Sequence, residues 1–98
     1  MPKAMLRRIR SKISTGSFDL TIHAVDEMAE DRLDILDVES AIFRGRIVKT
    51  ARDALGRVRY TIHGIAADES GLVAIVGRFT ESGRFLIITV YSVPEAEL

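Results

Sequence analysis

Four polar side chains in the second half of the chain have the chemistry needed to act on a phosphate group. Arg59, His63, Arg78 and Tyr91 lie in segments where polar and apolar residues alternate, as they do in β-strands. An arginine can hold a phosphate through two parallel hydrogen bonds and stabilise charge that develops on it. A histidine or tyrosine on the same surface can relay a proton, and a tyrosine ring can also stack on a base. The alternative is that arginines on edge strands only discourage aggregation of the sheet.

A second set of polar residues, His23, Glu27, Glu30 and Asp31, shares one face of an expected helix. Nearby carboxylates stabilise a cationic imidazole, so His23 could take part in proton transfer. The same nitrogen and oxygen atoms could also bind a metal ion. Acidic helix faces exposed to solvent are common, however, and we therefore predict that no metal site and no cofactor is present.

The first segment of the chain is a basic amphipathic helix. Its apolar residues recur at helical spacing. Its cations could contact a nucleic-acid backbone or the acidic surface of a partner. Alternatively, they form a solvated face that balances the acidic residues after the helix. Two further arginines near the ends of expected strands could also contact nucleic acid. The candidate contacts are Lys3, Arg7, Arg8 and Arg10 in the helix, and Arg57 and Arg84 in the sheet.

Three helices are expected to position these side chains. The apolar spacing predicts helices over 3–14 and 22–30, the second capped by Thr21. Asp34 is followed three positions later by another aspartate, which is typical of a capping box and predicts a third helix. Gly45 is suited to the position that ends this helix.

The spacing of the apolar residues then changes from helical to alternating. Four strands are expected, at 46–52, 57–65, 72–80 and 84–93. Turn-forming residues separate them about every ten residues, which is typical of an antiparallel meander. The sequence therefore predicts one α+β domain spanning residues 1–98. Its helical part, 3–45, is expected to pack on one face of a four-stranded antiparallel meander sheet, 46–93, and to leave the other face free.

The composition of the chain fits a protein of a reducing compartment. It has 98 residues, 47% of them hydrophobic, no cysteine, and a formal net charge of zero. No apolar run approaches the roughly 20 residues that a membrane-spanning helix requires. No apolar stretch follows the basic start of the chain, so a secretory signal peptide is not expected. We predict a cytoplasmic protein with no membrane contact, in which any nucleic-acid binding depends on a local basic patch.

Most of the chain, roughly residues 18–93, resembles the DUF4258 family of domains of unknown function. Many members of that family carry arginines at two positions where this chain has Glu27 and Asp31, so no basic catalytic residue is carried over there. The segments that carry the resemblance are His23–Asp31, Asp37–Ile42 with Gly45, Gly56–Tyr60, Gly64 and Ile87–Tyr91.

The family is similar to the RelE-type toxins in its order of helices followed by sheet. The resemblance implies the toxin of a type II toxin–antitoxin system, a metal-independent endoribonuclease in which the 2′-hydroxyl of the RNA attacks the neighbouring phosphate. The acidic form of the motif in this chain is similar to that of proteins paired with small antitoxins of the zinc-finger or DNA-binding type. The catalytic residues would be His23, Arg59, His63, Arg78 and Tyr91.

Two other functions stay open at this point. The chain could be a non-catalytic module that only binds a partner protein, with its acidic second helix docked on a basic surface. It could also bind a metal through His23, Glu27 and Asp31, which we rank last.

Overall fold

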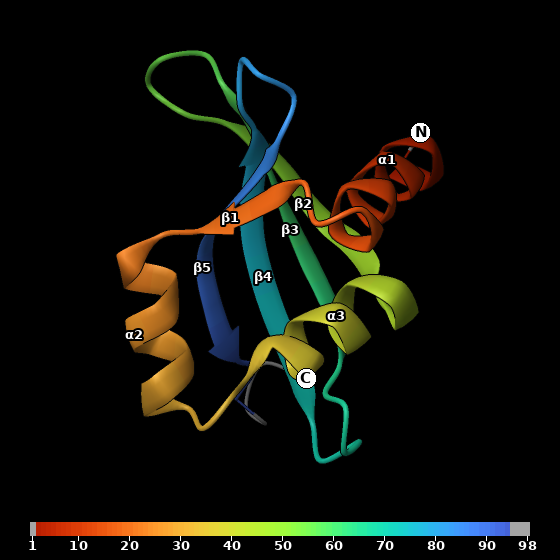
Figure 1. The fold of residues 1–98 in the computed structure, drawn as a ribbon, viewed down its shortest axis with the longest axis vertical. Coiled ribbons are helices and arrows are strands. Elements are labelled where there is room, and N and C mark those ends of the chain that lie inside the picture. The colour runs from red at the N-terminus through yellow and green to blue at the C-terminus, as the bar shows by residue number, and fades with distance from the viewer. Residues whose placement is uncertain (1, 95–98) are drawn as a thin grey trace.

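The computed structural model describes residues 2–94 and has three helices and five strands (Figure 1). The helices are α1 (Pro2–Ser14), α2 (Ile22–Glu30) and α3 (Ile35–Arg44). Among the described residues, none of the helices has the length and apolar character required to cross a bilayer. The strands are β1 (Phe18–Leu20), β2 (Arg46–Arg52), β3 (Val58–Ile65), β4 (Leu72–Phe79) and β5 (Phe85–Ser92).

The predicted helix starts are confirmed in atomic detail. The Thr21 hydroxyl accepts a hydrogen bond from the Ala24 backbone at the start of α2. Asp34 forms both halves of a capping box with Asp37 at the start of α3. Gly45 ends α3 as expected, but its φ of −103° is not left-handed. Glycine is needed there for space, since a Cβ atom would collide with backbone oxygens of α3 and β3.

The sheet has the order β1-β5-β4-β3-β2, and the four antiparallel strands of the predicted meander are present. The prediction of only four strands is wrong. Residues Phe18–Leu20, to which the sequence analysis assigned no strand, pair in parallel with β5 and place Phe18 opposite Phe85. Three residues are too few to show a period, and their pairing depends on contacts made far along the chain.

The core lies between the helices and one face of the sheet. Ile9 of α1 and Ile42 of α3 are fully buried against Ile62, Ile75 and Phe85 of the sheet. Figure 1 shows α1 and α3 over the same face, while α2 lies along β5. Within the part of the chain that the structure describes, no helix covers the opposite face, as predicted for an antiparallel sheet with one solvated side.

Candidate nucleic-acid interface

The uncovered face of the sheet carries a transverse row of side chains that includes both predicted proton-transfer groups. The register pairs Arg46 with His63, His63 with Ala74, and Ala74 with Tyr91. His63 and Tyr91 therefore flank Ala74, separated by two strand spacings of about 4.8 Å each. Ala74 is fully buried between them, so its small side chain is the floor of this row.

Two further rows continue the same face towards the β2–β3 turn. In the next row Lys49 pairs with Thr61, and Thr61 with Val76. One step farther, the register that pairs Tyr60 with Gly77 brings Arg59 beside Arg78. The three rows contain the cations Arg46, Lys49, Arg59 and Arg78 and no carboxylate.

A shallow groove of about 430 Å³ lies over the middle row. Val76 and Thr61 form its floor, and it is bounded by His63 and Tyr91 towards one end and by Arg59 towards the other. The sheet thus gathers four of the five predicted catalytic residues on one face. Arg78 is the one of these four that does not line the groove itself, because it lies beside Arg59 one row farther on.

Arg59 keeps hydrogen-bonding capacity despite a nearby carboxylate. Its Nε atom is 3.8 Å from Asp53, too far for a hydrogen bond, and has no other partner. Asp53 instead accepts hydrogen bonds from the backbones of Leu55 and Arg57 and from the Arg57 side chain. Burial acts to raise the pKa of Asp53, but these hydrogen bonds outweigh it and hold the pKa below its ordinary value.

The two other predicted sheet arginines make contacts within the fold. Arg57 forms its ion pair with Asp53 in the β2–β3 turn, at 2.9 Å. Arg84 donates to Asp19 of β1 at 2.8 Å and to the Phe18 carbonyl at 3.0 Å. The Arg84 hydrogen bond lowers the pKa of Asp19 and raises that of Arg84. These arginines therefore fix a turn and the β1 edge.

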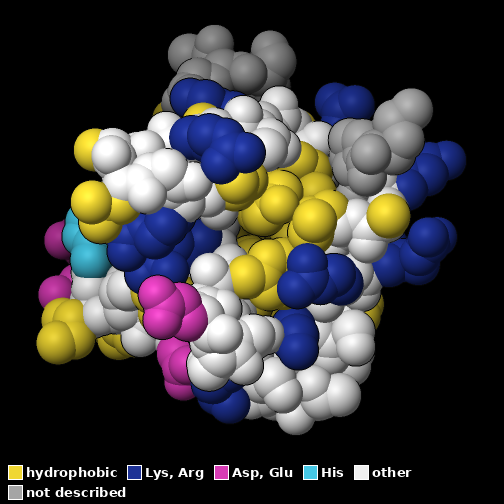
Figure 2. Space-filling view, turned by 90° about the horizontal axis from the view of Figure 1, so that it is seen from above, with side chains coloured by type: hydrophobic (Ala, Val, Ile, Leu, Met, Phe, Trp, Pro, Cys, Tyr) yellow, Lys and Arg dark blue, Asp and Glu magenta, His cyan; other side chains and the backbone are white. Residues whose placement is uncertain are grey.

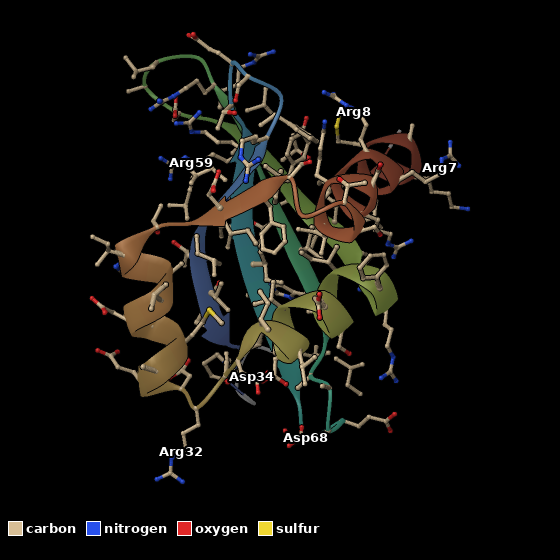
Figure 3. The ribbon with its side chains drawn as sticks, in the orientation of Figure 1. Arg7, Arg8, Arg32, Asp34, Arg59 and Asp68 are labelled. Atoms are coloured by element: carbon tan, nitrogen blue, oxygen red, sulfur yellow. The ribbon has the colours of Figure 1, made fainter. Side chains whose placement is uncertain are left out.

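The cations of α1 lie on the helical side of the sheet, away from the groove. Arg10 donates to the carbonyls of Ile42 and Gly45 at 2.8 and 3.1 Å and so caps the end of α3. Arg8 stacks over the Phe79 ring at 4.2 Å. Figure 2 shows lysine and arginine side chains around an apolar area at the end of the molecule that it views. Lys3 and Arg7 are exposed, and Figure 3 shows Arg7 pointing away from the helix.

His23 is not brought to the groove. It lies at the start of α2, 67% exposed, with its Nε2 atom 3.2 Å from Glu27. It is absent from the groove lining, and no hydrogen bond links it to the sheet among residues 2–94.

Glu27 and Asp31 have a role that the sequence analysis missed. Beyond the residues of β5 that pair with β1, the outer edge of β5 has backbone N–H groups that no strand pairs with. Carboxylates of α2 accept hydrogen bonds from two of these groups. Glu27 accepts from the Val90 N–H at 3.2 Å, and Asp31 accepts from the Ser92 N–H at 2.8 Å. The i, i+4 spacing of the carboxylates on the helix matches the i, i+2 spacing of the exposed amides on the strand. Among the described residues, no group of three His, Asp or Glu side chains has the geometry of a metal site.

The fold and this site define a small α+β domain with an uncovered, basic sheet face. The sequence model of the DUF4258 family, described as a domain of unknown function, matches residues 20–92. The chain belongs to this family, as its motifs predicted. The matched region contains the whole groove and excludes α1. No curated protein and no solved structure gives a significant match.

Proposed function

We propose that the protein is a metal-independent endoribonuclease of the RelE-like toxin type, with RNA bound across the uncovered sheet face. The observation that carries this proposal is the grouping of His63, Tyr91, Arg59 and Arg78 on one face, in strand rows that contain no carboxylate. Cleavage of RNA without a metal needs a base, an acid and cations around one phosphorus atom. In this proposal His63 supplies the base, Tyr91 supplies the acid, and Arg59 and Arg78 supply the cations.

The strand spacing suits an in-line reaction between His63 and Tyr91. His63 accepts the proton of the 2′-hydroxyl, whose oxygen then bonds to phosphorus. The bond from phosphorus to the 5′-oxygen breaks, and Tyr91 donates a proton to that oxygen. The products are a 2′,3′-cyclic phosphate and a free 5′-hydroxyl. Two strand spacings, about 9.6 Å between backbones, leave room for a phosphate between the two rings.

The arginines stabilise the charge that builds up on the phosphorus oxygens. Arg59 lines the groove with its side chain 40% exposed, and Arg78 stands beside it. Preorganised donors of this kind act most strongly on charge that is present only in the transition state. In this proposal His23 has no catalytic role, because it is tied to Glu27 on α2.

An enzyme that cleaves cellular RNA acts in the cytoplasm and requires control. We propose a partner antitoxin, of the zinc-finger or DNA-binding type implied by the family resemblance, that covers the sheet face. An acidic or polar segment of the partner would match the four cations of that face.

The test is incubation of the purified protein, freed of any antitoxin, with total RNA in the presence of a chelator. His63→Ala, Tyr91→Phe and Arg59→Ala should each lower the cleavage rate by about a hundred- to a thousand-fold. Arg32→Ala is the matched control, since Figure 3 shows Arg32 at the opposite end of the molecule from Arg59. If the wild type cleaves no faster than a Tyr91→Phe, Arg78→Ala double variant, the enzyme proposal is abandoned.

A non-catalytic binding module is the second candidate, and exposed apolar residues on α2 favour it. Ile22 is 82% exposed and Val25 lies beside it on the outer side of the helix, next to Asp26. This surface suits a partner with apolar and basic residues. In that case RNA stays intact at high protein concentration, and substitutions on α2 rather than on the sheet weaken partner binding.

A further inference from the structure

A second groove, of about 440 Å³, adjoins the proposed catalytic groove. Its lining combines two arginines and His63 with two glycines and two apolar side chains: Arg44, Gly45, Arg46, His63, Gly64, Ile65 and Leu72. His63 lines both grooves, so it forms the boundary between them. The two hollows therefore form one path across β2 and β3.

Two glycines beside this hollow let α3 approach β3 closely. A Cβ atom at Gly64 would lie 2.6 Å from the Cα and carbonyl carbon of Ala41, and one at Gly45 would lie 2.8 Å from the Gly64 Cα. The Ala41 backbone therefore occupies the space that a side chain at Gly64 would need, and the hollow lies outside this contact. The arginines on either side of Gly45 stand at its rim.

The charges around this hollow favour an anion. Arg46 is exposed and has no ion pair among residues 2–94. Arg44 pairs with Glu69 at 3.0 Å, but both side chains are about half exposed or more, so a phosphate can compete for the arginine. The carbonyls at the end of α3 would oppose an anion, but Arg10 already donates to those of Ile42 and Gly45.

We infer that this second groove is a phosphate subsite, so that the bound RNA is a single strand extending past His63 towards Arg46. Arg46 and His63 are direct neighbours in the sheet, about one strand spacing apart. A phosphate adjacent to the one in the catalytic groove would thus reach Arg46. The inference deepens the proposed function, on which it rests for the cleaved phosphate, and it adds a minimum substrate length beyond a dinucleotide.

Binding of 2′-O-methyl RNA, which cannot be cleaved, tests this inference separately from catalysis. Fluorescence anisotropy would compare a labelled dinucleotide with a labelled pentanucleotide. The wild type should bind the pentanucleotide about tenfold more tightly. Arg46→Ala should remove most of that difference, leave dinucleotide binding unchanged, and reduce the salt dependence of pentanucleotide binding by about one unit of slope.

Arg46→Lys and Arg32→Ala are the controls, the first retaining the charge and the second lying far from both grooves. The inference is overturned if the wild type binds neither oligonucleotide, if both bind equally, or if Arg46→Ala weakens both to the same extent. A length dependence that needs Arg46, in a protein that cleaves no RNA, supports the subsite and refutes the ribonuclease. Cleavage of RNA with no dependence of binding on length supports the ribonuclease and refutes the subsite.

Discussion

The contact between α2 and the edge of β5 gives the sharpest prediction for stability. Replacing Glu27 with alanine removes the acceptor for the Val90 N–H and leaves that amide at an edge that no strand covers. The Glu27 side chain is only 23% exposed, so water can replace the carboxylate in part. The variant should therefore be destabilised but should keep its fold.

The expected loss follows from the type of hydrogen bond. A hydrogen bond to a charged group contributes about 1.5–3 kcal/mol, and partial access of water puts this one near the lower limit. We expect Glu27→Ala to lower the free energy of unfolding by about 1.5 kcal/mol. For a domain of this size that is a fall of roughly 6–12 °C in Tm. Glu27→Gln keeps a carbonyl acceptor and should lose about half as much or less.

Urea denaturation followed by circular dichroism measures these losses. Glu30→Ala, on the same helix and exposed, is the matched control and should change stability by no more than about 0.5 kcal/mol. Hydrogen exchange should also show faster exchange of the Val90 amide in Glu27→Ala than in the control. If Glu27→Ala and Glu30→Ala unfold at the same urea concentration, the carboxylate does not stabilise the sheet edge and our reasoning fails.

Two further predictions concern packing and pH. Gly64→Ala should destabilise the fold by about 3 kcal/mol or more, because the added Cβ would meet the Ala41 backbone, which cannot move aside. Gly71→Ala is the control, because a Cβ there has open space around it, and it should unfold within a few degrees of wild type in a thermal melt. The Arg84 hydrogen bond lowers the pKa of Asp19 in the fold, so its stabilisation is present above about pH 4 and is lost as pH falls through the folded pKa. Urea midpoints between about pH 6 and 2 should therefore fall more steeply in wild type than in Asp19→Asn, and equal slopes would count against the pair.

The elements that the sequence predicted are those set by local signals. The helix caps at Thr21 and Asp34 depend on residues three positions apart, and the meander depends on alternation within each strand. The placement of Arg59 and His63 on one face follows from the same alternation. Tyr91 joins them because the register shift at Val76/Gly77 reverses the phase of β5 between the buried Ile87 and the buried Val90.

The features that the sequence did not reveal depend on partners far along the chain. Glu27 binds a backbone amide 63 positions away, and Arg84 reaches back 65 positions to Asp19. Backbone amides carry no side-chain signature, so nothing in the sequence near Val90 points to a carboxylate partner. The register shifts at Ile47/Lys49 and Val76/Gly77 are likewise set by packing, since each inserts a residue without changing the local composition.

The covered edge of β5 also limits how copies of the protein can associate. Sheets grow into fibres when both edges of each molecule accept another strand. Within residues 2–94 the sheet ends on one side in the three-residue β1, followed by the carboxylates of α2, and on the other side in β2, which is the longer edge strand. Two copies joined through β2 would use up their longer edges and leave only the three-residue β1 of each copy. Pairing between sheets would therefore end at a closed, two-fold dimer instead of continuing into a polymer.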